Sequence, residues 1–278
     1  MTPLIFDRPA LRRHRDRAAR HVARVAPVLQ EVAERLLDRL DDTTHRFHQA
    51  LDVGGRGVVA PLLRARGVEV ISCDLSQHMA ARNGGAAVAA DEEFLPFAPA
   101  SFDLVVANLS LHGVNDLPGA LIQLRRVLRP DGLFLASMPV LGTLDALRRA
   151  LTEAEAELCG GAAPRVAPFP DLRDTAGLLQ RAGFALPVAD LEEIRLRYDT
   201  PLNLLRDLQA AGESNAIAER SRRMPPRALF PLALARLPQD ITLRLGMLTG
   251  WAPANSQPKP LKPGSAQISL ASILGPED

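Results

Sequence analysis

Residues 49–57 constrain the fold of this chain more than any other stretch. They form a short apolar strand ending at Asp52 and Val53, followed by a loop with Gly54, Gly55 and Gly57. Glycines let the backbone turn sharply and approach a ligand closely, and a following helix points free N–H groups at the same place. The stretch predicts the first strand–loop–helix unit of a nucleotide-binding α/β domain, although a purely structural turn also explains a glycine loop taken alone.

An acid further along the chain strengthens this prediction. Residues 68–73 are expected to form a second strand, which ends in Asp74, 22 positions after Asp52. An acid about 20 residues beyond the glycine loop is placed to accept hydrogen bonds from ribose hydroxyls. The cofactor contacts predicted from this half of the chain are Asp52, Gly54, Gly55, Gly57, Asp74 and Leu75.

From residue 49 onward, strand-like and helix-like runs alternate, as in a parallel sheet covered by helices. The expected strands are 49–53, 68–73, 86–90, 102–108, 133–138, 184–189, 192–198 and 241–247. The expected helices are 28–40, 58–66, 117–128, 143–158 and 171–182. Helical segments within 201–238, broken at Gly212 and at Pro225, are expected to form an insertion over the ligand edge of the sheet.

Polar residues follow the third and fourth expected strands, at the edge where ligands of open α/β sheets bind. Asp91, Glu92 and Glu93 follow the third strand, and one of them is expected to accept a hydrogen bond from an adenine amino group, with a solvated acidic loop as the alternative. Asn108 ends the fourth strand and is predicted both as a cofactor contact and as a catalytic residue. His112 is a candidate general base, and the alternative is that it only holds the loop.

Composition excludes several functional classes. The net charge is +1, so no global field favours nucleic acid. Cys73, expected to be buried, and Cys159 give no disulfide framework and indicate a reducing compartment. No uncharged apolar run of about 18 residues predicts a transmembrane helix, which leaves peripheral membrane association open. No metal site is predicted.

Three regions are expected along the chain. Residues 1–48 form a basic arm and a helix, 49–252 form the α/β domain, and 253–278 form a proline-rich tail extended over the surface. In the arm, Asp7 is expected to cap a helix that has Pro9 in its first turn. The arginine-rich part of this arm is either a lid or partner-binding element, or a solvated helix face.

The ordered motifs resemble those of class I S-adenosylmethionine-dependent methyltransferases. The motifs are Leu51-Asp52-Val53-Gly54, Asp74, Asp91, Phe102-Asp103-Leu104-Val105 and Leu128-Arg129-Pro130-Asp131-Gly132. The resemblance implies a Rossmann-like α/β fold with a seven-stranded, mostly parallel sheet, and S-adenosyl-L-methionine as cofactor. The superfamily signature, Asp-x-Gly-x-Gly-x-Gly, is one residue longer than the loop here, which is expected to shift the amides that face the donor's methionine end.

Other segments are similar to the mitochondrial respiratory complex I assembly factor 5 family, over almost the whole chain. They are residues 5–8, 90–97, 109–118, 207–215 and 256–266. This resemblance implies a protein-modifying enzyme that hydroxylates an arginine on an iron–sulfur subunit of complex I. Asp91, Glu92 and Glu93 would then hold the guanidinium. A more distant resemblance is to malonyl-acyl-carrier-protein methyltransferases.

Two alternatives remain open at this point. One is a conventional methyltransferase acting on a small carboxylate or acyl-carrier substrate, and the other is a non-catalytic assembly chaperone. Because the family resemblance begins at residue 4, a bacterial cytoplasmic location is expected, with a processed form in the mitochondrial matrix as the alternative.

Overall fold

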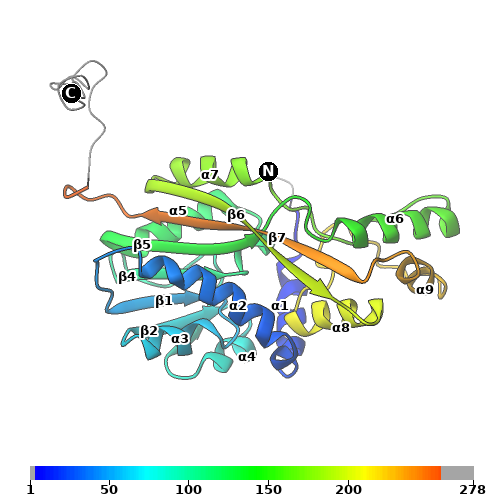
Figure 1. The fold of residues 1–278 in the computed structure, drawn as a ribbon, viewed down its shortest axis with the longest axis horizontal. Coiled ribbons are helices and arrows are strands. Elements are labelled where there is room, and N and C mark those ends of the chain that lie inside the picture. The colour runs from blue at the N-terminus through cyan, green and yellow to red at the C-terminus, as the bar shows by residue number, and fades with distance from the viewer. Residues whose placement is uncertain (1–3, 258–278) are drawn as a thin grey trace, which may run out of the picture.

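The computed structural model describes residues 4–257, which form a seven-stranded sheet with helices on both faces (Figure 1). The strands are β1 (Gln49–Val53), β2 (Glu69–Asp74), β3 (Ala87–Ala89), β4 (Phe102–Asn108), β5 (Leu128–Pro139), β6 (Ala185–Arg197) and β7 (Asp240–Trp251). Their order in the sheet is β3-β2-β1-β4-β5-β7-β6. The first five strands pair in parallel, β7 is antiparallel to β5, and β6 is antiparallel to β7. The predicted class I methyltransferase fold is confirmed.

Helices connect the strands and cover the sheet. They are α1 (Arg8–Ala18), α2 (Ala26–Leu37), α3 (Val59–Ala65), α4 (Gln77–Ala80), α5 (Leu117–Val127), α6 (Asp145–Cys159), α7 (Leu172–Arg181), α8 (Pro201–Ala211) and α9 (Leu229–Leu234). The expected cap of the first helix is present, because Asp7 accepts a hydrogen bond from the Ala10 amide and Pro9 lies in the first turn. Gly212, with φ of 85°, ends α8 as expected.

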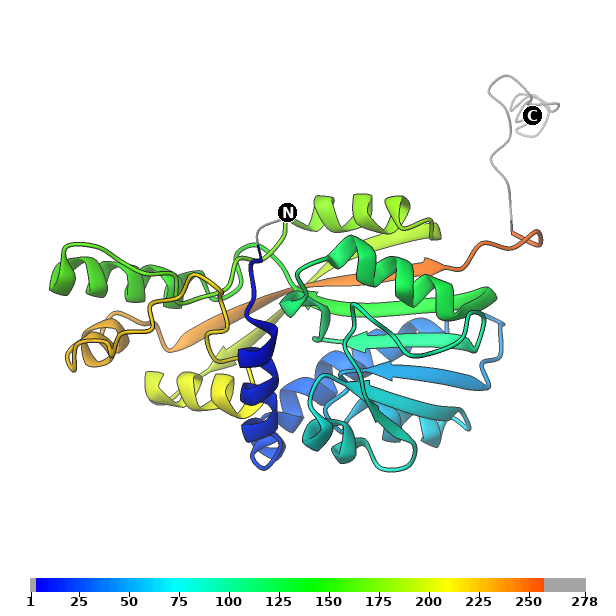
Figure 2. The same cartoon turned by 180° about the vertical axis from the view of Figure 1, so that it is seen from behind.

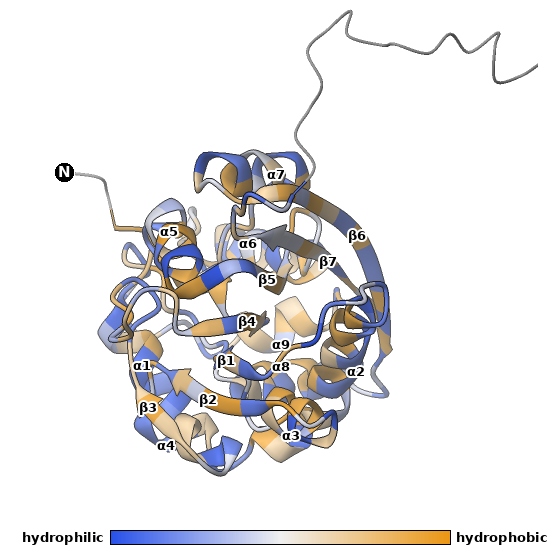
Figure 3. Cartoon of the chain, turned by 90° about the vertical axis from the view of Figure 1, so that its left-hand side faces the viewer, coloured by the Kyte–Doolittle hydropathy of each residue, from blue (hydrophilic) through white to orange (hydrophobic). Residues whose placement is uncertain are grey.

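Two apolar layers hold the helices against the sheet. Alternate residues of β4 point to opposite faces, so Leu104 and Val106 pack with α2 and α3, whereas Val105 and Ala107 pack with α5 and α7. Figure 3 shows α2 and α3 on one side of the sheet and α5 on the other. Cys73 is fully buried in the second layer, as predicted for a small apolar residue.

Three strands differ from the expectation. Strand β7 continues to Trp251 instead of ending at residue 247. The runs 184–189 and 192–198 form one strand, β6, because Asp190 lies exposed on an edge strand and can remain in water without ending the pairing. Strand β5 begins at Leu128 instead of at residue 133. The turn 129–132 bulges out of the ladder, since Phe102 pairs with Leu128 and Leu104 already pairs with Leu133.

The arm and the insertion meet over the carboxyl ends of the parallel strands (Figure 2). Phe6 forms an antiparallel bridge with Ile217, and the Asp7 amide donates to the Ala216 carbonyl at 2.8 Å. Only α8 and α9 of the insertion are helical, and the stretch between them runs without helix across the arm. The arm and the insertion thus form a cover over the ligand edge. Of the tail predicted from residue 253, positions 258–278 lie outside the described residues.

Candidate functional site

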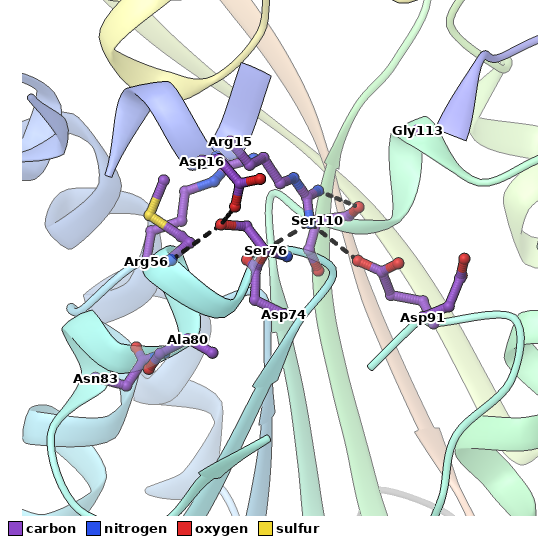
Figure 4. Close-up of polar contacts among 12 residues, drawn as sticks. Arg15, Asp16, Arg56, Asp74, Ser76, Ala80, Asn83, Asp91, Ser110 and Gly113 are labelled. Carbon is purple, nitrogen blue, oxygen red and sulfur yellow. Dashed lines mark hydrogen bonds and ion pairs between the residues drawn. The ribbon is translucent and has the colours of Figure 1, made fainter. Parts of the chain in front are cut away.

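Carboxylates gather at the carboxyl edge of the sheet, where the sequence predicted them (Figure 4). Asp74 ends β2, while Asp91 and Glu92 follow β3. Asp74 and Glu92 are almost completely buried, and the side chain of Asp91 keeps 26% of its surface exposed. Because these parallel strands end at the same edge, acids far apart in the sequence converge on one site.

Arg15 of α1 enters this acidic site and is 1% exposed. Its Nη1 lies 3.0 Å from Glu92 Oε1 and 3.5 Å from Asp74 Oδ2, and its Nη2 donates to the Ser110 carbonyl at 3.3 Å. Burial alone lowers the pKa of Arg15, but the charges of Asp74 and Glu92 outweigh it and the net shift is upward. The guanidinium is therefore held as a cation inside the site.

Arg8, seven residues earlier on the same helix, pairs with the outer part of the site. It binds Asp91 Oδ1 at 2.5 Å, contacts the Glu92 carboxylate and donates to the Gly113 carbonyl at 3.0 Å. Burial raises the pKa of Glu92, yet Arg15 and Arg8 bring it below its usual value. The sequence did not single out either arginine. The available signal was helical phase, because residues seven apart share a helix face, here with the buried Leu11.

Two amides of the glycine loop donate hydrogen bonds to other parts of the protein. The Gly54 amide donates to the Cys73 carbonyl, and the Gly57 amide donates to Asn83 Oδ1, both at 2.7 Å. Gly54 has φ of 68°, and a Cβ there would lie 2.5 Å from the Ser110 Cβ. Glycine is thus required by conformation and by the close approach of Ser110.

Asp52 lies under this loop and is fully buried. Its Oδ2 accepts a hydrogen bond from Ser72 Oγ at 3.2 Å. Burial raises the pKa of Asp52 to about 7, and neighbouring Asp74 adds to the shift. A Cβ on Gly55 would lie 2.1 Å from Asp52 Oδ1, so this carboxyl supports the loop from below.

Arg56, within the shortened loop, joins the site to the insertion through Glu213. Arg56 Nη2 lies 2.5 Å from Glu213 Oε1, and the second oxygen, Oε2, lies 2.8 Å from Nε2 of His112. Burial raises the pKa of Glu213, but His112 and Arg56 bring it well below its usual range. A carboxylate orienting an imidazole is the arrangement that a general base requires. Neither Arg56 nor Glu213 was predicted from the sequence.

Two other predicted site residues make contacts within the protein. Asn108 Nδ2 donates to the Leu29 carbonyl at 3.0 Å, and its Oδ1 accepts from Ser137 Oγ at 2.8 Å. Leu75 packs against the small apolar cluster of α1. The structure thus gives Asn108 a bracing role between β4, β5 and α2. Its cofactor and catalytic roles, like the other cofactor contacts, remain predictions.

The acceptors of this edge fit the ribose end of S-adenosyl-L-methionine. Asp74 Oδ2 and Ser110 Oγ are buried without a hydrogen-bond partner among the described residues. An acid at the end of the second strand is the group that binds ribose hydroxyls in this class of fold. Arg15 lies beside the same oxygen, so a bound ribose would compete with its guanidinium.

The described part of the chain offers neither a metal cluster nor a membrane-spanning helix. Within residues 4–257 no group of three or more His, Cys, Asp or Glu side chains is placed to hold a metal ion. No helix in this part is long and apolar enough to span a bilayer.

Comparison with known proteins places the chain in a family. A methyltransferase domain model matches residues 51–136, which supports the predicted cofactor, S-adenosyl-L-methionine. The mitochondrial arginine-hydroxylase NDUFAF5 of Danio rerio is 37% identical over 286 residues, covering 97% of this chain and 89% of that protein. Malonyl-[acyl-carrier protein] O-methyltransferase of Methylovorus sp. is 35% identical over 249 residues, covering 84% of this chain and 82% of that protein.

Solved structures show the same fold. The YcgJ protein of Bacillus subtilis superimposes with a TM-score of 0.56 at 15% identity, covering 80% of this chain and 99% of that one. A putative methyltransferase of Bacillus halodurans gives a TM-score of 0.54 at 16% identity, with coverage of 80% and 100%. The chain is therefore a methyltransferase-fold enzyme that belongs to the NDUFAF5 arginine-hydroxylase family.

Proposed function

We propose that the chain is a protein-modifying enzyme that hydroxylates an arginine of a respiratory complex I subunit during assembly. The observation that carries this proposal is that the acidic edge holds guanidinium groups. Asp74, Asp91 and Glu92 bind the guanidinium groups of Arg8 and Arg15. The relatives named arginine hydroxylases supply the reaction type.

The outer end of this acidic site is where a substrate arginine can enter. Arg8 is 12% exposed and Asp91 is 26% exposed, whereas Arg15 is sealed inside. A guanidinium needs several planar acceptors, which the Asp91 carboxylate and the Gly113 carbonyl provide. The substrate arginine is proposed to take the place that Arg8 holds.

Hydroxylation replaces one C–H bond of the substrate by C–OH. With molecular oxygen as oxidant, the second oxygen atom leaves as water, and a two-electron donor supplies the reducing equivalents. His112, oriented by Glu213, is the group in the site that can accept or return a proton at its imidazole. The carboxylates would hold the substrate guanidinium in a fixed position.

The proposal is tested in a bacterial deletion strain of this gene by mass spectrometry of the iron–sulfur subunits of complex I. Wild-type chain should restore an increment of one oxygen atom on an arginine, and Asp91→Asn should restore much less of it. Glu69→Gln is the matched control, because Glu69 is an exposed acid at the opposite end of β2 from Asp74. An arginine mass that does not change between the deletion and complemented strains contradicts the hydroxylase.

A conventional methyltransferase is the second candidate. It is favoured by the malonyl-[acyl-carrier protein] O-methyltransferase relatives and by an apolar cavity beside His112 that would suit an acyl group. S-adenosyl-L-methionine bound at the edge would supply an electrophilic methyl group. Mass spectra of the acyl-carrier protein from the same strains separate the candidates, because a methyltransferase adds the mass of one methylene group to its acyl chain, whereas the hydroxylase leaves that mass unchanged. Restored complex I assembly without any modification would instead support a chaperone.

The proposed partner is an iron–sulfur subunit of complex I, and the proposed location is the bacterial cytoplasm with peripheral association at the membrane. The named relatives are mitochondrial, which supports the matrix as the corresponding compartment. Co-purification of the tagged chain with soluble or membrane-bound complex I intermediates tests both points. Recovery of the chain without any complex I subunit would contradict the partner, and its absence from every membrane fraction would contradict the peripheral association.

A further inference from the structure

A cavity of about 370 Å³ lies on the insertion side of the site. It is bounded by residues of α2, α6, α8 and β7, and the arm closes one side with Phe6 and Leu11. Most of its lining is aliphatic, including Leu29, Leu144, Leu147, Leu204, Leu205 and Leu243. An arginine substrate held by carboxylates does not account for such a lining.

The size and lining of the cavity indicate an organic ligand instead of water. Small-molecule sites measure roughly 300–1,000 Å³, and an apolar cavity of about 150 Å³ already stays dry and binds benzene. The present cavity is more than twice that size. It therefore has room for a chain of roughly eight to twelve heavy atoms.

The polar end of the cavity carries two unsatisfied atoms. Arg56 Nε and His112 Nδ1 are buried without hydrogen-bond partners among the described residues, and both side chains line the cavity. Since the Glu213 carboxylate only accepts, Nε2 of His112 carries the proton that it donates. In the neutral imidazole, Nδ1 is then an acceptor, whereas Arg56 Nε is a donor. A hydroxyl group matches both requirements, because it donates and accepts.

The charge around this end argues against an anionic head group. Three buried or partly buried guanidinium groups, those of Arg8, Arg15 and Arg56, face four carboxylates. The carboxylates are those of Asp74, Asp91, Glu92 and Glu213. The other charged residues of the lining, Arg165 and Asp207, are each already paired, with Glu155 and Arg24. Among the described residues around the cavity, no positive charge is left over to bind an anion.

From this lining and these atoms we propose that the cavity binds a neutral medium-chain amphiphile, with its hydroxyl head at Arg56 and His112 and its chain among the leucines of α6 and α8. The site goes beyond arginine modification, because it takes a second molecule of different chemistry. Such a molecule would be a lipid-like cosubstrate or effector that sits against the candidate base.

Calorimetry on the full-length chain tests the proposal with octan-1-ol, octyl methyl ether and octanoate. Octan-1-ol should bind saturably with one site. The ether, which cannot donate to His112, and the anionic octanoate should each bind about tenfold more weakly. Non-saturable partitioning of octan-1-ol, or equal affinity for octanoate, would overturn the proposal.

Two variants on one helix locate the site. Leu205→Trp fills the cavity from a partly buried position of α8 and should abolish octan-1-ol binding. Leu202→Trp places the same ring on an exposed position of α8, outside the cavity, and should bind as the wild type does. Equal binding by both variants would show that the alcohol binds elsewhere. This measurement does not depend on arginine modification, so the two proposals can fail separately.

Discussion

Arg15 and Asp74 lie 3.5 Å apart, Nη1 to Oδ2, with side chains 1% and 0% exposed, although 59 positions separate them in the sequence. The arm is thereby part of the site and not a solvated basic helix. Arg12 and Arg13 of the same helix remain exposed. One face of this helix is therefore the charged solvent face considered from the sequence, whereas its buried arginine face was not expected.

Removal of the Arg15 charge should destabilise the protein strongly. In Arg15→Met, Asp74 and Glu92 lose their common buried counter-ion, and breaking such a buried pair costs roughly 3–5 kcal/mol. The free energy of unfolding from denaturant titration measures the effect. Arg12→Met, on the exposed face, should change it by less than about 0.5 kcal/mol. Equal stability of the two variants would contradict a structural role for the Arg15 ion pairs.

In the wild-type protein, the Arg15 guanidinium should also weaken binding of the cofactor. Its guanidinium occupies the acid that would bind ribose, so only the fraction of molecules with a free Asp74 is competent. Calorimetry with S-adenosylhomocysteine should show binding tightened about tenfold in folded Arg15→Met and lost in Asp74→Asn.

Two outcomes of that titration would carry different conclusions. Weaker binding in folded Arg15→Met than in wild type would make Arg15 a cofactor contact. If neither the wild type nor Arg15→Met binds S-adenosylhomocysteine, the cofactor takes no part in the proposed reaction. Arg12→Met is the matched control here as well, because it removes one charge from α1 without touching the acids.

Parallel-strand geometry explains which site residues could be predicted. Asp74 ends one short strand and Asp91 follows another, and parallel strands align their carboxyl ends, so their convergence needs no long-range information. Glu213 and Arg15 come from segments whose docking is decided by tertiary packing of the insertion on the arm. Many other charged residues surround both of them in the sequence. Only the shared helix face of Arg8 and Arg15 distinguishes these two arginines from their charged neighbours.

The same reasoning applies to the fold. The first four parallel strands were expected at nearly their observed positions because each is a compact apolar run. Strand β6, at one edge of the sheet, is a single strand but was expected as two runs, since its polar Asp190 interrupts the alternation. An edge strand tolerates that residue because one of its faces meets water, which the sequence alone does not reveal.

Asp52 should make stability fall as the pH rises from about 4 to about 7. Its pKa is 3.8 in an ordinary environment and is raised to about 7 by burial, so between these values the native state holds a proton that the unfolded state has lost. Stability then falls with pH, by up to about 4 kcal/mol across the window. The unfolding free energy of Asp52→Asn should lack this component, whereas exposed Asp42→Asn should keep it. If the free energies of unfolding of wild type and Asp52→Asn change with pH in parallel, the raised pKa of Asp52 is contradicted.

His112 should act on the reaction more than on the fold. Loss of a general base typically costs a factor of about 10²–10⁴ in rate. In His112→Gln, product formation measured by mass spectrometry should fall by at least about 100-fold, with S-adenosylhomocysteine binding and the melting temperature almost unchanged. Glu213→Gln should lower both activity and stability, because it leaves the buried Arg56 charge without its carboxylate.

A second histidine–carboxylate pair provides the control for this prediction. His78 Nδ1 lies 3.4 Å from Asp16 Oδ1, but its side chain is 70% exposed and it lies outside the cavity. His78→Gln should leave modification at the wild-type level, which separates the base from a general effect of removing an imidazole. Full activity of His112→Gln combined with a lowered melting temperature would instead identify His112 as a residue that only holds the loop after β4. In that case the proton acceptor must come from the substrate or from another group of the acidic edge.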